Sequence, residues 1–386
     1  MEIEIGTGKT ARRGYGFDEV AIVPSRRTRD PDDVDISWEI DAWRFDLPLM
    51  ASAMDAIVSP ATAVQIGNLG GLAVLNLEGL QTRYDDPEPI FDEIATLTDD
   101  KATRRMQELY KEPIKEELIG KRIREIKEGG VIAAASLTPQ RVRSYSQLVL
   151  EAELDILVIQ GTVVSAEHVS TKSEPLNLKE FIARYDIPVV VGGCASFSTA
   201  LHLMRTGAVG VLVGVGPGAA CTTRGVLGVG VPQATAIADA AAARMQHLHE
   251  TGRYVHVIAD GGMRRGGDIA KAIACGADAV MTASPLARAY EAPGRGYHWG
   301  MATFHPDLPR GTRVETKQIG SLEEILVGPA HENDGTLNLF GALRTSMATC
   351  GYGTIKEFQK AELMVAPAMK TEGKALQQQQ GVGQGT

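Results

Sequence analysis

Three consecutive segments decide the fold: IPVVVGG (Ile187–Gly193), SFSTALHLMRT (Ser196–Thr206) and AVGVLVG (Ala208–Gly214). The first and third are short, almost continuously apolar runs that end in glycine. Such runs are typical of parallel strands that are covered on both faces, because neither face then needs polar residues. The middle segment predicts a helix between them. Together they indicate a strand–helix–strand unit of a parallel sheet.

The same kind of run occurs eight times along the chain. The runs begin at intervals of 25, 60, 23, 33, 21, 47 and 23 residues, and most intervals suit one strand and one helix. Eight such units predict a (β/α)8 TIM barrel, with a doubly wound sheet as the alternative. The predicted strands are Asp46–Ser52, Gly71–Asn76, Val131–Ser136, Leu154–Gln160, Ile187–Gly193, Ala208–Gly214, Val255–Asp260 and Asp278–Thr282.

The composition excludes several classes of protein. With 386 residues, 44% of them hydrophobic and 23% charged, the chain suits one large α/β barrel and is not collagen-like, coiled-coil or largely disordered. The 39 basic residues against 48 acidic ones give a net charge of -9, which argues against binding to nucleic-acid polymers. No apolar stretch has the length of a bilayer span and the start is not a signal peptide, so we expect a cytoplasmic protein without membrane association.

Other common motifs are missing from the sequence. The four cysteines have no paired spacing, which argues against a disulfide framework and against a zinc ribbon. The eight histidines include no H-E-x-x-H pattern, so a metal hydrolase is not expected. No G-x-G-x-x-G motif opens a strand–helix unit, so a dinucleotide would bind without a Rossmann domain.

Material beyond the eight units falls in three places. Residues 81–130 follow the second predicted strand, and in 101–130 half of the residues, 15 of 30, are charged; we expect a solvated helical excursion that packs one thin apolar stripe. Residues 291–318 are rich in Gly and Pro and are predicted to form a flap-like active-site loop. Residues 1–370 would then form one catalytic domain, and residues 371–386 a disordered tail.

Polar residues matter most directly after the strands, because TIM-barrel active sites lie at the carboxyl ends of the strands. After the sixth run, residues 214–230 read GVGPGAACTTRGVLGVG, with Cys221 followed by two threonines and surrounded by glycines. A thiolate is a good nucleophile for an electron-poor carbon, and the flexible backbone allows close approach to a ligand. We therefore predict that Cys221 is a nucleophile; the alternative is an inert cysteine in a tight turn.

The next two loops predict a phosphate site. Asp260-Gly261-Gly262 ends the seventh run, and Ser284 follows the eighth. Paired glycines that lead into a helix expose amide N–H groups to an anion, and barrel phosphate sites often lie after strands seven and eight. Asp260 is placed to accept hydrogen bonds from ribose hydroxyls, unless it only caps the following turn.

The combination of these motifs resembles the IMP dehydrogenase/GMP reductase family over nearly the whole chain. The likeness lies most closely with short bacterial members that lack the tandem CBS regulatory domains, whose place the charged excursion takes. The matching motifs are residues 16–24 (GFDEVAIVP), 51–55 (ASAMD), 216–223 (GPGAACTT), 259–262 (ADGG), 267–271 (GDIAK), 291–294 (EAPG) and 338–344 (NLFGALR).

The resemblance implies a covalent mechanism. Cys221 would add to C2 of a purine nucleotide monophosphate, GMP or IMP, while hydride passes between C2 and a nicotinamide, supplied as NADPH or NAD(H). A monovalent cation, potassium, would bind the backbone oxygens of Gly216, Gly218 and Cys221, and the chain would assemble as a homotetramer or octamer. The implied nucleotide contacts are Asp260 to the ribose, Gly261, Gly262 and Ser284 to the phosphate, Ser52 and Met54 beside the base, and the backbone of Gly300, Met301 and Ala302 at its edge.

Two activities occur in this family. A dehydrogenase uses an adjacent Arg-Tyr pair on its flap to activate water, and no such pair lies between Glu291 and Ser321. A reductase uses a Thr and a Glu for proton transfer, and Thr223 and Glu291 fall at matching positions. The sequence therefore favours a GMP reductase (GMP and NADPH to IMP, ammonia and NADP) over an IMP dehydrogenase (IMP, NAD and water to XMP and NADH).

Three departures from the family pattern leave further alternatives. Ala219 replaces a common phosphate-binding Ser, Cys194 replaces an Asn near the nucleotide, and Gln160 replaces an Asp that contacts cofactor or ribose. Weaker nucleotide binding follows more naturally than loss of the chemistry, since one hydroxyl contact contributes about 1 kcal/mol. The open alternatives are a catalytically inactive nucleotide-binding paralogue and a flavin enzyme that uses the same phosphate site.

Overall fold

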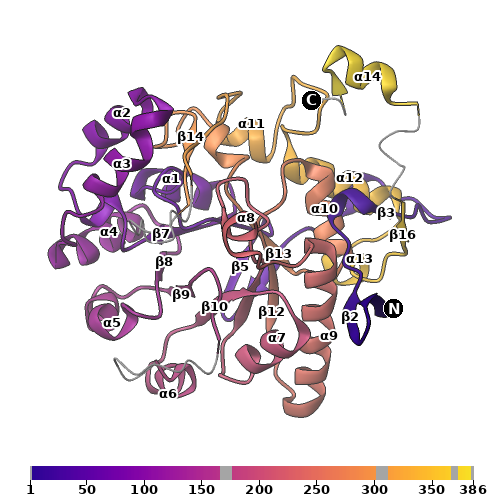
Figure 1. The fold of residues 1–386 in the computed structure, drawn as a ribbon, viewed down its shortest axis with the longest axis horizontal. Helices are drawn as coiled ribbons and strands as arrows, with labels where there is room; N and C mark the ends of the chain where they lie inside the picture. Colours follow the sequence, from indigo (N-terminus) through magenta and orange to yellow (C-terminus); the bar gives the residue numbers. More distant parts are fainter. Residues whose placement is uncertain (1, 166–175, 301–311, 367–372, 384–386) are drawn as a thin grey trace.

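The computed structural model describes residues 2–165, 176–300, 312–366 and 373–383. Eight parallel strands close into a barrel in the order β10-β11-β12-β13-β6-β7-β8-β9. All eight predicted runs form these strands, which confirms the TIM barrel and excludes the doubly wound sheet (Figure 1). The strands are β6 (Leu49–Ala51), β7 (Leu72–Asn76), β8 (Ala134–Leu137), β9 (Ile156–Gln160), β10 (Val189–Cys194), β11 (Gly210–Val213), β12 (His256–Asp260) and β13 (Ala279–Thr282).

Helices surround the barrel and bury its outer face. Ser59 and Ser196 show how the sequence starts them, since each accepts a hydrogen bond from the backbone N–H three residues later. The surrounding helices are α1 (Pro60–Asn68), α4 (Glu116–Glu128), α5 (Val142–Glu151), α6 (Leu178–Arg184), α7 (Phe197–Met204), α9 (Gln233–Thr251), α10 (Gly266–Ala274) and α12 (Leu339–Thr349).

Smaller elements complete the chain. Four antiparallel pairs lie outside the barrel: β1 (Glu2–Gly6) with β2 (Lys9–Arg12), β3 (Val20–Ile22) with β16 (Leu363–Val365), β4 (Trp38–Ile40) with β5 (Trp43–Phe45), and β14 (Tyr297–His298) with β15 (Val314–Glu315). The remaining helices are α2 (Glu88–Thr96), α3 (Asp99–Leu109), α8 (Thr223–Leu227), α11 (Leu322–Leu326), α13 (Ile355–Phe358) and α14 (Ala375–Gln380), with 3-10 turns at Phe17–Glu19, Pro31–Asp33, Leu80–Thr82 and Leu286–Arg288.

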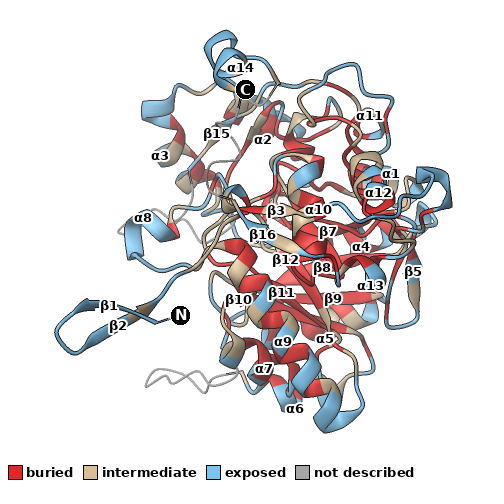
Figure 2. Cartoon of the chain, turned by 90° about the vertical axis from the view of Figure 1, so that its right-hand side faces the viewer, coloured by how far each residue is buried: buried red, intermediate tan, exposed pale blue. Residues whose placement is uncertain are grey.

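The barrel interior is a packed core and not a pore. Side chains such as Met50, Val158 and Ile258 point inward and are fully buried. The hairpin β4–β5 closes the amino-terminal end of the barrel, where Trp38 stacks on Phe45 with ring centroids 5.6 Å apart. Burial follows the barrel and its helices, while the β1–β2 hairpin projects into solvent (Figure 2). The opposite, carboxyl end is therefore the one left for a site.

The charged excursion differs from the sequence prediction. Its apolar stripe lies on α4, which packs against α1 and α5 as an ordinary barrel helix. Helices α2 and α3 form a second layer with a hydrophobic cluster of their own, to which Phe91, Met106 and Leu109 contribute together with Trp299 from the flap. The stripe expected within residues 101–130 thus lies on α4, while the sequence analysis did not predict the second layer, in which a few large apolar side chains bury against residues distant in sequence.

The base of the flap-like loop is attached to this excursion. Strands β14 and β15 form its two sides, and residues 301–311 at its centre lie outside the described residues. Arg295 pairs with Glu88 and Asp92 of α2, at 2.6 and 3.0 Å. Arg313 donates to the carbonyls of Ile94 and Leu97 at 2.5 and 2.7 Å. The excursion and the flap therefore form one continuous wall at this end of the barrel.

The tail also differs from its prediction. We expected no structure from Thr371 onward, but residues 375–380 form helix α14, in which no residue is buried. Alanine, leucine and glutamine are good helix formers, which explains a helix whose apolar residue Leu376 stays exposed. Within the described ranges, no helix has both the length and the apolar character needed to cross a membrane.

Candidate active site

A cavity of about 1270 Å³ opens at the carboxyl ends of the barrel strands. Residues from loops that are far apart in sequence line it together, which is the geometry expected for a TIM-barrel active site. The predicted residues that line the cavity are Ser52, Met54, Gly216, Gly218, Cys221, Thr223, Asp260, Gly261, Gly262, Ser284 and Gly300. Two other predicted contacts, Met301 and Ala302, lie outside the described residues.

Cys221 and Thr223 lie next to each other in the cavity wall. Cys221 is the exposed cysteine among the four, and its thiol donates to the Thr223 hydroxyl, with 3.2 Å between Sγ and Oγ1. The backbone N–H of Cys221 donates to the carbonyl of Gly218 at 3.1 Å, which closes a tight turn. Thr223 is buried and begins helix α8. The thiol therefore faces the cavity with one hydroxyl fixed beside it.

The same loop carries its own positive charge. The side chain of Arg224 packs against Gly216 and Gly230, where an added Cβ would lie 2.6 and 2.7 Å from Arg224. Its guanidinium donates to the carbonyls of Val215 and Val231 at 3.2 and 2.6 Å. Backbone carbonyl oxygens are the kind of ligand that a potassium ion takes. The donor type thus fits the cation, and Arg224 occupies the carbonyls of Val215 and Val231, which are not among its predicted ligands.

Asp260 ends β12 and faces Gln160 at the end of β9. The amide of Gln160 donates to the Asp260 carboxylate at 3.2 Å. Burial raises the pKa of Asp260 to about 7, and the hydrogen bond from Gln160 opposes that rise. The backbone carbonyl of Asp260 accepts a hydrogen bond from Gln233 at 3.1 Å, which holds the strand end in place. An acceptor with this environment suits hydroxyl donors such as those of a ribose.

The phosphate side of the cavity is partly preorganised. Gly261 and Gly262 have φ angles of 78° and 81°, and an added Cβ would press against Pro217 at 3.3 and 3.1 Å. The N–H of Gly261 already donates to the carbonyl of Met281 at 3.0 Å. Gly262 is therefore the better placed of the two glycines to donate its N–H to a phosphate.

Ser284 has a partner that sequence reasoning did not predict. Its hydroxyl lies 3.0 Å from Nε2 of His298, and both residues line the cavity. Burial lowers the pKa of His298 to about 4, so the ring is neutral at physiological pH and orients the serine hydroxyl. The only signal in the sequence was the place of His298 at the start of the flap.

Glu291 does not lie in the cavity wall. Its carboxylate accepts a hydrogen bond from the backbone N–H of Leu322 at 3.0 Å, at the start of α11. The sequence analysis gave Glu291 a part in proton transfer, which stays a prediction; among the described residues, Glu291 is not part of the cavity wall that contains Cys221. Cys194 is likewise buried in β10, where its thiol donates to the Leu212 carbonyl. Ala219 does line the cavity, without a hydroxyl to offer.

The excursion supplies residues that sequence reasoning missed altogether. Arg104 and Gln107 of α3, together with Tyr110 and Lys111 just after it, line the same cavity as Cys221. Arg141, after the neighbouring strand β8, lines the cavity as well. Their spacing in the sequence resembles that of an ordinary solvated helix, so only the packing of α3 against the flap reveals them.

The size of the cavity tests whether a nicotinamide dinucleotide would fit beside a mononucleotide. Its volume of about 1270 Å³ exceeds the 300–1,000 Å³ that is common for one small ligand. Gln160, Gly161 and Thr162 at the end of β9 continue the wall from Asp260 towards Thr138 and Arg141. The residues present therefore leave room for two ligands that meet near Cys221.

The fold and this site define a barrel oxidoreductase with a cysteine in its sixth strand loop. The sequence matches the family model described as IMP dehydrogenase / GMP reductase domain over residues 14–304. The chain belongs to this family, whose members are nicotinamide-dependent oxidoreductases that act on purine nucleotides. This confirms the resemblance found in the sequence motifs.

Several relatives cover most or part of the chain. A protein of Mycolicibacterium smegmatis named an uncharacterized oxidoreductase is 50% identical over 94% of this chain and 99% of its own length. The inosine-5'-monophosphate dehydrogenase of Escherichia coli is 37% identical over 55% of this chain and 47% of its own. The crystal structure of an IMP dehydrogenase/GMP reductase-like protein from Corynebacterium glutamicum superposes with a TM-score of 0.90, at 48% identity and with 94% and 97% of the two chains covered.

Proposed function

We propose that this protein oxidises IMP to XMP with NAD through a covalent adduct on Cys221. The proposal rests most directly on one observation: Glu291, the residue that favoured a reductase, is bound to the backbone of Leu322 and does not line the cavity. The relatives with a stated activity agree with this direction. Proteins of Escherichia coli and Methanocaldococcus jannaschii, 37% and 27% identical, are both named inosine-5'-monophosphate dehydrogenase.

The first step would be addition of the Cys221 thiolate to C2 of the purine. A bound nicotinamide would accept the hydride from C2. C2 would then remain bonded to the sulfur of Cys221 as a thioimidate. Cys221 is exposed and lines the cavity, which supports attack on a bound purine, and the nearby Thr223 hydroxyl can exchange a proton with its Sγ. Water then adds to C2 and the C–S bond breaks, which releases XMP and the thiol.

The other predicted residues would hold the nucleotide for that step. Asp260 would accept hydrogen bonds from the ribose hydroxyls, and Gly262 and Ser284 would donate to the phosphate. Ser52 and Met54 lie in the wall where the loop after β6 reaches the cavity, which supports their predicted place beside the base. Held at ribose and phosphate, the purine ring would be fixed in distance and orientation relative to Sγ.

GMP reductase activity is the second candidate. The 3.2 Å contact between Thr223 and Cys221 favours it, since a threonine at this position assists proton transfer to the leaving ammonia in the reductase mechanism. Water activation also lacks its usual Arg-Tyr pair: Arg313 does lie over the Tyr297 ring, 4.3 Å from its centroid, but neither residue lines the cavity. Both directions share the adduct on Cys221.

A paired assay tests the proposal. One reaction contains IMP and NAD and is followed by XMP formation; the other contains GMP and NADPH and is followed by loss of NADPH absorbance. Formation of XMP without GMP-dependent NADPH loss is the expected result. The reverse result would establish the reductase, and binding of IMP or GMP with neither turnover would indicate a nucleotide-binding paralogue.

Two further expectations from the family stay proposals. Potassium would bind backbone oxygens of Gly216, Gly218 and Cys221, and a titration of turnover with KCl against choline chloride tests it.

Assembly as a homotetramer or octamer is tested by light scattering in solution. The exposed apolar side chains of Val226, Leu227 and Val229 beside the cavity support such an interface.

A further inference from the structure

The cavity has two ends with different chemistry. Asp260 ends β12, Gly261 follows it, and Ser284 follows β13, where the nucleotide phosphate is expected. The excursion follows β7, and Arg141 follows β8. In the ring of eight strands, β7 is three strands from β12 and β8 is three strands from β13, so the two sets of loops lie on different sides of the opening. A mononucleotide has one phosphate group. The residues predicted to bind that phosphate lie on one side of the cavity, so they leave the other side without an assigned ligand.

The side away from the phosphate loops is basic. Arg83, Arg104, Lys111 and Arg141 line it, in a chain whose net charge is -9. Arg83 is already engaged with the Glu78 carbonyl at 2.9 and 3.1 Å. For the side chains of Arg104, Lys111 and Arg141, the described residues provide no ion pair or hydrogen bond, and all three residues are exposed. Three cations that face one cavity without partners indicate an anionic ligand.

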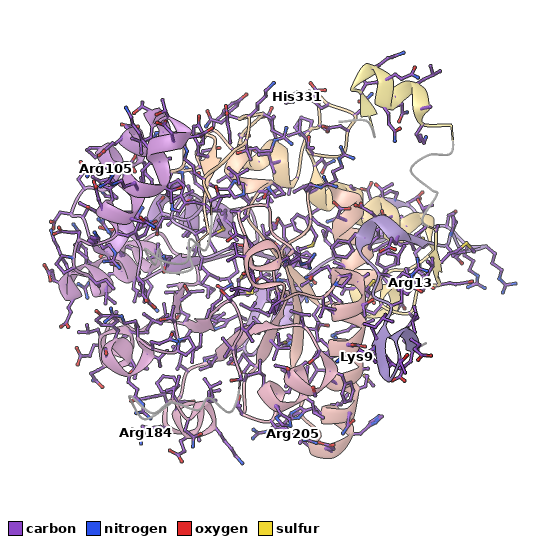
Figure 3. The ribbon with its side chains drawn as sticks, in the orientation of Figure 1. Lys9, Arg13, Arg105, Arg184, Arg205 and His331 are labelled. Atoms are coloured by element: carbon purple, nitrogen blue, oxygen red, sulfur yellow. The ribbon has the colours of Figure 1, made fainter. Side chains whose placement is uncertain are left out.

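The acidic residues nearby do not neutralise these cations. Glu108 pairs with Arg105 at 3.0 Å, and Glu78 accepts the backbone N–H of Thr138 at 2.5 Å. Arg105, next in sequence to Arg104, pairs with Glu93 as well, at the outer edge of the molecule (Figure 3). The two neighbouring arginines of α3 therefore differ: Arg105 has carboxylate partners, while Arg104 faces the cavity.

This basic wall is held rigidly. The hydroxyl of Tyr110, between Gln107 and Lys111 in the wall, donates to the buried carboxylate of Asp55 at 2.5 Å. The indole of Trp299 donates to the same hydroxyl at 2.8 Å. The Tyr84 hydroxyl donates to the carbonyl of Leu109 at 3.0 Å. Contacts of this kind fix the end of α3 relative to the first barrel loop and to the flap, so the backbone that carries Arg104 and Lys111 is held at the cavity.

We propose that Arg104 and Lys111 of the excursion, with Arg141 after the neighbouring strand β8, bind the phosphates of the nicotinamide dinucleotide. The inference rests on the proposed function, which requires such a dinucleotide, and it adds that the excursion is a cofactor-binding element. A dinucleotide that starts beside C2 of the purine and extends past Gln160 and Thr138 reaches this side of the opening. Its pyrophosphate, or a 2'-phosphate on its adenosine, is the chemical group that the cations recognise.

Direct binding tests the inference without depending on turnover. NADH and NADPH are titrated by their own fluorescence into protein saturated with IMP, for the wild type, Arg104→Ala, Lys111→Ala and the double variant. Each single variant is expected to bind a dinucleotide about tenfold more weakly, as for loss of one charge-assisted contact. The thermal shift caused by IMP alone is expected to stay unchanged. Arg124→Ala, an exposed arginine of α4 outside the cavity, is the matched control and is expected to bind like the wild type.

The two sources of phosphate give different patterns. Weaker binding of NADPH alone identifies the 2'-phosphate as the partner, whereas an equal loss for NADH and NADPH identifies the pyrophosphate. Arg104→Lys keeps the positive charge and is expected to retain most of the affinity for the dinucleotide. Arg104→Gln removes the charge and is expected to lose that affinity, while circular dichroism shows that its fold is intact.

Two results would overturn the inference, and they are distinguishable. If the wild type binds dinucleotide and the double variant binds it equally well, the excursion is not the site, while the proposed function stands. If the wild type binds neither dinucleotide in the presence of IMP, the ligand class is wrong and the proposed function fails with it. An equal loss of dinucleotide and IMP binding would overturn the assignment of a separate subsite.

Discussion

The hydroxyl of Tyr110 lies 2.5 Å from the carboxylate of Asp55, although the two residues are 55 positions apart in the sequence. Asp55 follows the first barrel strand and Tyr110 ends a helix of the excursion, so this hydrogen bond joins the barrel to the wall of the cavity. Burial raises the pKa of Asp55 to about 6, and hydrogen bonds from Tyr110 and from the backbone N–H of Leu80 limit the rise.

Tyr110→Phe is expected to destabilise the protein by about 1–3 kcal/mol, because a buried carboxylate and the Trp299 indole each lose a partner. The loss of one donor raises the pKa of Asp55 above its present value near 6. Since the folded-state pKa already exceeds that of the unfolded chain, stability from this group falls as pH rises between about 4 and 6. Urea unfolding at pH 5 and pH 8 measures both effects. Tyr290→Phe, at an exposed tyrosine, is the control and should change neither.

Cys221→Ala is expected to abolish turnover in either direction while IMP still raises the melting temperature. The alanine lacks the nucleophile, but the contacts to ribose and phosphate remain. Initial rates and thermal shift in the same buffer measure the two properties. Cys350→Ala, at a buried cysteine outside the cavity, tests whether loss of any thiol suffices. Full activity of the Cys221 variant would rule out the covalent mechanism.

Glu291→Gln is expected to leave kcat for IMP oxidation within about threefold of the wild type. The carboxylate accepts the N–H of Leu322 and does not line the cavity, and the amide oxygen of glutamine can accept the same hydrogen bond. A loss of about a hundredfold or more, with the melting temperature unchanged, would place Glu291 in proton transfer after all and would support the reductase.

Nucleotide binding is expected to strengthen as pH rises through about 7, the pKa to which burial raises Asp260. The ionised carboxylate accepts hydrogen bonds from the ribose, so one pH unit below that pKa the affinity should be about tenfold lower. The free energy of unfolding of the free protein is expected to change in the opposite direction. Because the pKa of Asp260 is higher in the folded than in the unfolded chain, the stability that this group contributes is lost as pH rises from about 4 to about 7. Titrations of IMP binding from pH 5.5 to 8.5 measure the first effect.

Asp260→Asn is the control for that titration, because the nucleotide phosphate titrates near pH 6 in both proteins. The difference between wild type and variant isolates Asp260. Identical pH profiles for the two would remove Asp260 from ribose recognition.

Arg244→Met is expected to destabilise the fold by about 1.5–3 kcal/mol, since it removes one of the two close cations of the buried Asp278 carboxylate and leaves Lys356 as the other. Burial alone would raise the pKa of Asp278, but the charges of Arg244, 2.9 Å away, and Lys356 outweigh it and hold that pKa well below its usual range. Stability from this group is therefore present above about pH 4 and is lost as pH falls further. Chemical unfolding at pH 7 and at about pH 2.5 measures the loss, because only the lower pH lies below the ordinary pKa of an aspartate. The exposed Arg253→Met is the control. Equal stability at pH 7 would contradict the assignment of this pair as a structural bond.

The sequence by itself determined the barrel and the chemistry-bearing loops. Each strand is a local apolar run, and each loop residue follows its strand directly, so Cys221, Asp260 and Ser284 could be placed at the carboxyl end without knowing any long-range contact. The family followed from the same local motifs. The structure confirms the barrel, and the comparisons confirm the family.

Only the tertiary structure decided which side chains share the cavity. Glu291 was matched by position along the chain, yet its carboxylate turns to the N–H of Leu322, a partner 31 residues away. Arg104 and Lys111 looked like residues of a solvated helix, yet packing around Trp299 brings them to the cavity. Local spacing cannot show either outcome, because both depend on burial and hydrogen bonds between segments that meet only after folding.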